Sequence, residues 1–164
     1  MAKNTTLSFE FYPPQTKEGV EKLKQTAKDL NQFNPEFFSV TFGAGGSTKE
    51  KTLDTVLDLN KLGFNASPHI SCISSSKAEI KDLLDKYKSN KINHLVALRG
   101  DNPSGSINFG ELNYANELVS FIKSEMGDTF KIDVGAYPEV HPESESAKQD
   151  FINFKNKVEA GADS

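Results

Sequence analysis

The chain has 164 residues, with 19 Lys+Arg against 23 Asp+Glu and a formal net charge of −4. This length suits one domain that can bury a core, and a mildly acidic chain without a basic block is not expected to bind nucleic acid. We expect no membrane association, because no apolar run approaches the roughly 20 residues of a transmembrane helix and the N-terminus lacks a secretory signal. The sequence therefore predicts a cytoplasmic protein, or a piece of one.

Cysteine and histidine are too sparse for a metal centre. Cys72 is the single cysteine, which excludes an internal disulfide framework and a multi-cysteine zinc site. The three histidines do not stand at metal-ligand spacing. We therefore expect no bound metal.

Five short apolar runs predict β-strands. They cover residues 7–12, 37–42, 66–73, 94–98 and 132–137. Short, continuous runs of this kind are typical of strands buried on both faces, as in parallel sheets.

Apolar residues at helical spacing follow each run and predict five helices. Residues 47–50 and 76–79 have the sequence of a capping box, and Gly63, Gly127 and Gly161 follow helical stripes as C-terminal stops. We expect all the stripes to be core, including the last one, which contains Phe151, Phe154 and Val158.

Strands that alternate with helices predict a parallel α/β fold, either a doubly wound open sheet or a (β/α)8 TIM barrel. The glycine-rich residues 43–46 lack the spacing of a dinucleotide-binding loop. Polar residues at the carboxyl ends of several runs favour the barrel. A barrel needs about 250 residues. Residues 1–164 are therefore predicted to be the N-terminal portion of a single barrel domain, about five βα units, with units six to eight absent.

Glu10 is the first candidate catalytic residue. It stands between Phe9 and Phe11, and strand alternation places it on the opposite face. If that face lines a barrel, burial favours the protonated carboxyl, which suits a general acid. The alternative is a solvent-exposed carboxylate on an edge strand, and the residues alone leave both open.

Two further segments concentrate polar chemistry after predicted strands. In Arg99-Gly100-Asp101, a glycine between opposite charges allows close approach of a ligand, or the charges form a local ion pair. Residues 137–143 contain Tyr137, His141, two prolines and two glutamates, which predicts either a rigid site or a stiffened surface turn.

Other polar residues are ambiguous by themselves. His69 follows a proline at the end of a predicted strand and is either a ligand-binding or a structural histidine. His94 begins a predicted strand. Because the active site of a barrel lies at the carboxyl ends of its strands, we assign His94 no role. Asp150, Asn153 and Lys157 share one stripe of the last helix, which by itself is best explained as a solvated face.

Several motifs together resemble the methylenetetrahydrofolate reductase family in order and spacing. They are SFEFYPP (8–14), SVTFG (39–43), PH (68–69), ALRGD (97–101) and AYPEVHPE (136–143), and the resemblance extends from about residue 7 to 163. It implies a flavoprotein (β/α)8 barrel that binds FAD and reduces 5,10-methylenetetrahydrofolate to 5-methyltetrahydrofolate with NADH or NADPH. It also implies ping-pong hydride transfer through the flavin, a role in one-carbon metabolism and methionine biosynthesis, and a full-length homo-oligomer.

The resemblance also assigns site residues. Glu10 matches the catalytic acid and a folate contact, and Asp101 matches a carboxylate that orients the folate and tunes the flavin. The positions that match flavin contacts are Thr41, Ala44, His69, Arg99, Gly100, Asp101, Ala115, Tyr137, His141, Asp150, Asn153 and Lys157. Two positions depart from the family pattern: Phe42 stands where a tyrosine is often found, and Asn156 stands where a basic residue is expected near the FAD phosphates.

Two other functions stay open from the sequence. One is a different flavin barrel, similar to proline dehydrogenase, and the other is a non-catalytic half-barrel. We also expect residues 1–164 alone not to close a barrel, because the first and fifth strands would have unpaired edges that favour self-association.

Overall fold

The computed structural model describes residues 6–42, 49–100 and 110–164, without the side chain of Lys49. Ala44, Asp101 and most of the predicted capping box at 47–50 lie outside these residues. The chain divides into two compact units, residues 1–69 and 70–164.

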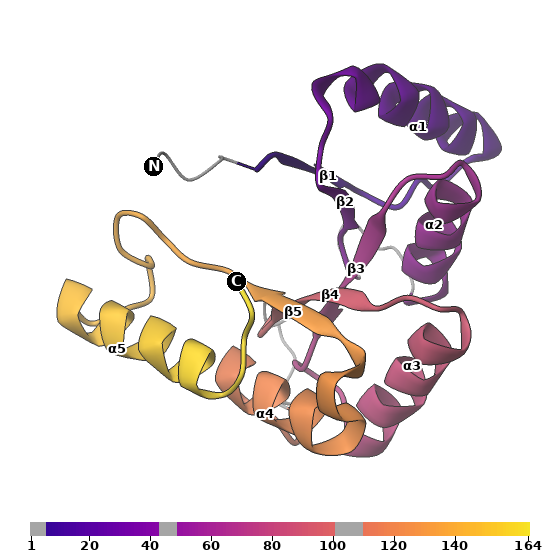
Figure 1. The fold of residues 1–164 in the computed structure, drawn as a ribbon. Coiled ribbons are helices and arrows are strands. Elements are labelled where there is room, and N and C mark those ends of the chain that lie inside the picture. Colours follow the sequence, from indigo (N-terminus) through magenta and orange to yellow (C-terminus); the bar gives the residue numbers. More distant parts are fainter. Residues whose placement is uncertain (1–5, 43–48, 101–109) are drawn as a thin grey trace. The chain divides into compact units, whose positions relative to one another are not determined.

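Strands and helices alternate along the chain, as predicted (Figure 1). The strands are β1 (Ser8–Phe11), β2 (Phe37–Val40), β3 (Ala66–Ser71), β4 (His94–Leu98) and β5 (Lys131–Val134). The α-helices are α1 (Lys17–Leu30), α2 (Lys49–Lys61), α3 (Lys77–Ser89), α4 (Ala115–Met126) and α5 (Ala147–Glu159), and two short 3-10 helices are η1 (Asn31–Phe33) and η3 (Gly127–Thr129).

The strands pair in the order in which they occur in the chain, β1-β2-β3-β4-β5. The pairs β1–β2, β2–β3 and β4–β5 are parallel. This arrangement confirms the parallel α/β class, and closure into a barrel stays a prediction.

In the first unit, aromatic side chains of β1 pack against one of β2. The ring of the buried Phe38 stacks on Phe9 and Phe11, at centroid distances of 6.1 and 5.5 Å, and meets the edge of Phe64 at 5.4 Å. Ser8 and Glu10 point to the other face, where they are exposed. The prediction of burial on both faces is therefore wrong for β1. It is confirmed for β3, in which every residue is buried.

The second unit has its core between the strands and helices α3 and α4. Leu95, Ile132, Leu84, Leu118 and Ile122 are all fully buried there. The predicted capping box is present at the start of α3, where the Ser76 hydroxyl accepts from Glu79 N at 3.2 Å and Ser76 N donates to the Glu79 carboxylate at 2.8 Å. These bonds satisfy amides that otherwise lack partners in the first turn.

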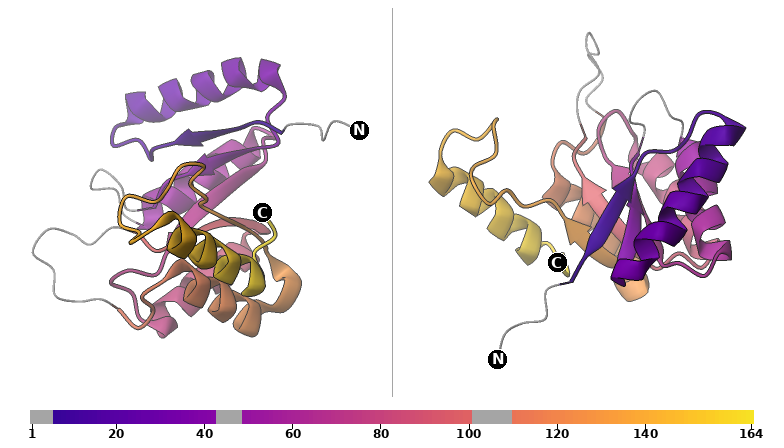
Figure 2. Two further views of the ribbon diagram at one scale, coloured as in Figure 1. Left: turned by 90° about the vertical axis from the view of Figure 1, so that its left-hand side faces the viewer. Right: turned by 90° about the horizontal axis from the view of Figure 1, so that it is seen from above.

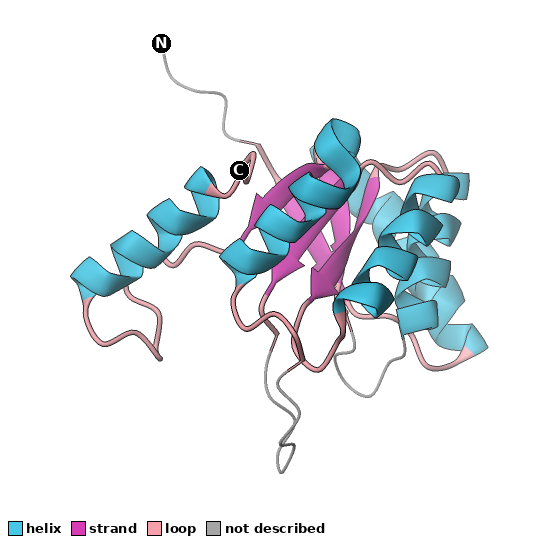
Figure 3. Ribbon diagram, turned by 90° about the horizontal axis from the view of Figure 1, so that it is seen from below, coloured by secondary structure: helices cyan, strands magenta, loops and turns pink. Residues whose placement is uncertain are grey.

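Helix α5 contradicts the prediction that its apolar stripe is core. Phe151, Phe154 and Val158 are 68%, 37% and 49% exposed, and α5 has no buried residue. Figures 2 and 3 show the reason: α5 stands apart from the strands of its own unit and approaches the rest only near its C-terminal end. Its amphipathic pattern is real, but no described residue covers the apolar face.

The residues after α5 return to the outer edge of β5. Ser164 N donates to Ile132 O at 3.4 Å, and Val134 N donates to Ser164 O at 2.8 Å. Because these two hydrogen bonds flank Asp133 on β5, Ser164 pairs with Asp133 in the parallel pattern. The edge of β5 that we expected to be open is therefore partly covered.

Candidate functional site

In the first unit, a contact between Glu10 and His69 joins strands β1 and β3. Glu10 Oε2 lies 3.4 Å from His69 Nε2. The His69 side chain is only 7% exposed, and this burial lowers its pKa to about 4. Because the imidazole is then neutral near pH 7, the contact joins a carboxylate to a neutral ring rather than two opposite charges.

Glu10 is less buried than the sequence predicts. Its side chain is 51% exposed. The reason is that β1 is the last strand on its side of the described sheet and its Ser8–Glu10 face has no cover among the described residues. The general-acid hypothesis for Glu10 therefore depends on its position and on its contact with His69, and not on burial.

Thr41 follows β2 and combines a fixed backbone with a hydroxyl that lacks a partner. Its N–H donates to Phe11 O at 2.9 Å, and its carbonyl accepts from Thr52 Oγ1 at 2.8 Å. Its own Oγ1 is buried and has no hydrogen-bond partner in the part of the chain that the structure describes. Such a group costs about 1–3 kcal/mol. A ligand with a polar atom at this position would remove that cost.

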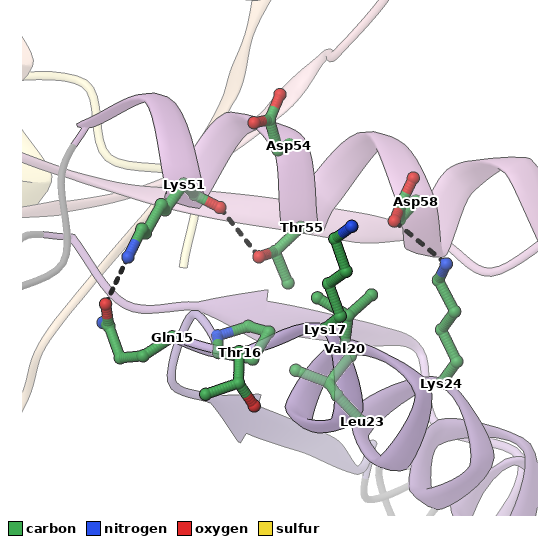
Figure 4. A pocket seen from close by; sticks show the side chains of 11 residues that line it. Gln15, Thr16, Lys17, Val20, Leu23, Lys24, Lys51, Asp54, Thr55 and Asp58 are labelled. Carbon is green, nitrogen blue, oxygen red and sulfur yellow. Dashed lines mark hydrogen bonds and ion pairs between the residues drawn. The ribbon is translucent and has the colours of Figure 1, made fainter.

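A cavity of about 240 Å³ lies between α1 and α2 in the same unit (Figure 4). Val20 and Leu23 line it, and an ion pair between Lys24 and Asp58, at 3.1 Å, closes one end. Lys51 donates a hydrogen bond to the Gln15 side chain at the other end. None of the predicted site residues lines this cavity, and no sequence motif indicated it. It therefore does not define the predicted site.

In the second unit, Arg99 and Gly100 follow β4. Arg99 Nη2 donates to Glu143 Oε2 at 2.7 Å, and Arg99 Nε donates to Gly100 O at 3.2 Å. The sequence suggested an ion pair for Arg99 within the loop. The structure pairs Arg99 with a carboxylate 44 residues further along the chain, and the alternative partner Asp101 lies outside the described residues.

Gly100 is required by packing against β3. Its φ is +85°, and a Cβ there would lie 2.1 Å from Ser71 Oγ and 2.8 Å from Ile73 Cγ2. The Ser71 hydroxyl is held in place because it donates to Arg99 O at 2.7 Å. The protein itself therefore makes a close approach at this glycine, and a ligand contact there stays a prediction.

The loop between β5 and α5 gathers four of the predicted flavin contacts. The rings of Tyr137 and His141 meet edge to face at 4.5 Å. His141 N donates to Asp150 Oδ2 at 3.2 Å, and Lys157 Nζ donates to Gly135 O at 2.6 Å. Burial lowers the pKa of Lys157, and the nearby charge of Asp150 opposes this effect. Two members of the α5 stripe therefore hold the loop rather than form a solvated face.

The remaining predicted residues stay outside this cluster. Asn153 Oδ1 accepts from Gln149 Nε2 at 3.0 Å along α5. Ala115 is half-buried at the start of α4, and its methyl side chain can make only apolar contacts.

A polar cluster that the sequence did not reveal joins β4 and β5. His94 Nε2 lies 2.7 Å from Asp133 Oδ2, and the Ser164 hydroxyl donates to the other carboxylate oxygen. Burial raises the pKa of Asp133, but hydrogen bonds from His94 and Ser164 outweigh it and hold the pKa below its usual value. The signal was available: His94 and Asp133 lie on adjacent strands, one diagonal step apart.

The described residues hold neither a metal-binding cluster nor a membrane-spanning helix. No group of three or more His, Cys, Asp or Glu side chains among residues 6–42, 49–100 and 110–164 could hold a metal ion. None of the helices in those ranges is long and apolar enough to span a bilayer.

The fold and these residues define a class: an α/β protein of parallel strands with polar side chains at strand ends and in the loops that follow. The chain matches the methylenetetrahydrofolate reductase family over residues 1–164, and it belongs to that family. This confirms the resemblance of its motifs.

Three relatives illustrate the match. The chain is 43% identical over 157 residues to the 5,10-methylenetetrahydrofolate reductase of Escherichia coli (strain K12), covering 95% of this chain and 52% of that protein. It is 42% identical over 158 residues to the corresponding protein of Pectobacterium carotovorum, covering 95% and 51%. In an alignment of 173 positions, it is 38% identical to methylenetetrahydrofolate reductase (NADH) 1 of Arabidopsis thaliana, covering 97% of this chain and 29% of that protein. The chain thus spans about half the length of the bacterial relatives it matches.

Proposed function

We propose that the protein that carries these residues reduces 5,10-methylenetetrahydrofolate to 5-methyltetrahydrofolate, with FAD as cofactor and NADH or NADPH as hydride donor. Membership of the family supports the reaction. The observation that carries the proposal is Glu10, half exposed at β1 with the neutral His69 ring 3.4 Å away. In this proposal the product supplies one-carbon metabolism and methionine biosynthesis.

The described residues fit a flavin. The buried Thr41 hydroxyl has no partner in the described part of the chain, and a bound polar group would provide one. In the second unit, Arg99, Tyr137 and His141 present donors and an aromatic ring, and Asp150 and Lys157 hold the loop that carries them. We also assign Ala44, His69, Gly100, Asp101, Ala115 and Asn153 to this site by their match to the family motifs.

FAD, when bound, supplies hydride transfer in two half-reactions, in a ping-pong scheme. The task of Glu10 is to donate a proton to a folate nitrogen as the five-membered ring opens. A carboxyl must be protonated to do so, which requires a drier environment than a 51% exposed side chain has. We propose that bound folate covers Glu10. The neutral His69 can offer a hydrogen bond without adding a charge that would keep the carboxylate ionised. Asp101 is assigned to orient the folate.

We also propose that residues 1–164 are the first five βα units of a (β/α)8 barrel that forms homo-oligomers. The alternation of elements, the pairing in chain order and the parallel pairing of Ser164 with β5 support this. Residues 1–164 purified alone are expected to self-associate and to lack folate turnover. A stable monomer with stoichiometric FAD and full turnover would contradict this proposal.

The test of the reaction uses the natural gene product that carries residues 1–164. We expect a yellow protein with flavin absorbance, whose reduced form is reoxidised by 5,10-methylenetetrahydrofolate. Reduction of the oxidised flavin by proline, with no reoxidation of the reduced flavin by the folate, would identify another flavin barrel. A colourless protein that takes up no added FAD would indicate a non-catalytic module.

A further inference from the structure

Arg99 is the only arginine in this chain, where the other 18 of the 19 basic residues are lysines. The two residue types are not equivalent at a binding site. A guanidinium is a rigid planar fork of five N–H donors, whereas an ammonium is a compact charge on a flexible stem. A guanidinium is useful to a ligand only if its plane is held, so the contacts that orient Arg99 matter.

Two hydrogen bonds on different nitrogens fix the Arg99 plane. Nη2 donates to Glu143 Oε2 at 2.7 Å, which is the short distance of a charge-assisted bond, and Nε donates to Gly100 O at 3.2 Å. The Arg99 side chain is 34% exposed, so its remaining N–H groups can reach a bound molecule.

Glu143 also belongs to the loop that carries the aromatic site residues. Its backbone N–H donates to His141 Nδ1 at 3.1 Å, and His141 N donates to Asp150 Oδ2 at 3.2 Å. Because His141 Nδ1 accepts this hydrogen bond, the ring proton lies on Nε2, which can donate to a bound molecule. Glu143 therefore orients the Arg99 guanidinium through its side chain and the His141 imidazole through its backbone N–H.

We propose that Glu143 is a positioning residue: it holds the Arg99 guanidinium and the 137–143 loop in the geometry that receives the flavin. This inference rests on the proposed function. Glu143 itself does not need to touch the flavin, and its effect on binding passes through Arg99.

FAD affinity provides the first test, measured by titrating the apo form of the natural gene product with FAD. Glu143→Gln keeps the size of the side chain and removes its charge, and we expect the Kd for FAD to rise about five- to tenfold. The matched control is Glu145→Gln on the same loop, because Glu145 is exposed and its side chain makes no hydrogen bond or ion pair with the described residues. Its Kd is expected to equal that of the wild type. An unchanged Kd in Glu143→Gln would overturn the proposal.

A double-mutant cycle separates positioning from general loss of structure. If Glu143 acts through Arg99, Glu143→Gln has little further effect on the Kd in an Arg99→Ala background. If the two effects multiply instead, Glu143 acts independently of Arg99 and the proposal is wrong. Thermal unfolding of each variant shows whether a change in Kd reflects partial unfolding.

A readout without flavin distinguishes this inference from the proposed function. In ¹⁵N-labelled apo protein, the Arg99 Nη–Hη signals are identified by their absence in Arg99→Lys. We expect the signal of the Nη2 group, which donates to Glu143, to be protected from exchange with water in the wild type and in Glu145→Gln, and exposed in Glu143→Gln. Equal exchange in all three would overturn the positioning role. If the wild type shows this protection but binds no FAD, the proposed function fails, and with it the flavin part of the inference.

Discussion

The polar site residues of the two units differ in how fully they are hydrogen-bonded. In the first unit, Thr41 Oγ1 is buried with no partner in the described residues, His69 is held neutral by burial, and Glu10 is half exposed. In the second unit, Arg99, His141, Asp150 and Lys157 are each tied by at least one hydrogen bond to another part of the unit.

The proposed function gives this difference a physical meaning. Groups that are already hydrogen-bonded and oriented lose little conformational entropy when a ligand arrives. Groups without partners, such as the Thr41 hydroxyl, gain most from a bound molecule, because it supplies the missing hydrogen bond. Substitutions in the two units can test this contrast, and their expected effects range from a large loss of rate to a small change in stability.

The largest effect is expected for Glu10→Gln in the first unit. Loss of a general acid typically reduces a rate by a factor of about 10²–10⁴. Folate reduction should fall by that factor, while FAD content and oxidation of NADH or NADPH by the flavin stay near wild type, because that half-reaction needs no acid. Stopped-flow measurement of the two half-reactions provides the test. The control is Glu18→Gln, an exposed carboxylate in α1. Folate turnover near the wild-type rate in Glu10→Gln would rule out the assignment.

Gly100→Ala tests whether the second unit is as tightly assembled as its contacts indicate. The new methyl group would enter at φ +85° and clash with Ser71 and Ile73. We expect the free energy of unfolding to fall by about 3 kcal/mol or more. Gly63→Ala is a matched control, because Gly63 has φ +86° and a methyl group added there would meet nothing within 4 Å. Its cost should be limited to backbone strain of about 1 kcal/mol. Equal losses in denaturant titrations would show that Gly100 is not closely packed.

His69 should make the stability of the first unit depend on pH. Its folded-state pKa, about 4, lies below the usual 6.5, so the unfolded chain binds more protons between these values. Stability is therefore complete above about pH 6.5 and decreases as the pH falls toward 4, by at most about 3 kcal/mol. His69→Gln should flatten this part of the stability–pH curve. A curve that is equally steep with and without His69 would show that its burial is incomplete.

Thr41→Val is expected to have the smallest effect and to separate two roles of one hydroxyl. Valine has nearly the same shape without the unpartnered oxygen, so apo stability should rise by about 1 kcal/mol. FAD affinity should decrease if the hydroxyl contacts the flavin. Thr52→Val is the opposite control, because it removes the donor to Thr41 O and should cost about 1 kcal/mol. If Thr41→Val destabilises the apo protein, its hydroxyl has a partner already.

Features set by nearby residues were predictable from the sequence. The 94–98 strand, the Ser76–Glu79 capping box, and the helix ends before Gly63 and Gly127 all depend on a few adjacent residues, and each is present. The parallel pairing followed from the alternation of elements. The position of Glu10 on the face opposite Phe9 and Phe11 followed from strand periodicity.

Features set by distant residues were not predictable. Periodicity identifies the apolar face of α5, but it does not state which surface covers that face, so Phe151 was wrongly expected to be buried. The exposure of Glu10 depends on the place of β1 at the end of the strand order. The pairing of Arg99 with Glu143 joins residues 44 positions apart, which no local spacing can encode.

The pairing of each strand with its predecessor in the chain has a consequence for how the protein forms. Among the described residues, one α-helix lies between each pair of neighbouring strands, so the contacts of each pair span only about one βα unit. Loop-closure cost grows slowly with length, and folding is faster when contacts are local in sequence. As the chain leaves the ribosome, each new strand therefore finds its partner already in place. In the described sheet β1 and β5 are the outer strands, and the edge formed last is that of β5, with which Ser164 pairs.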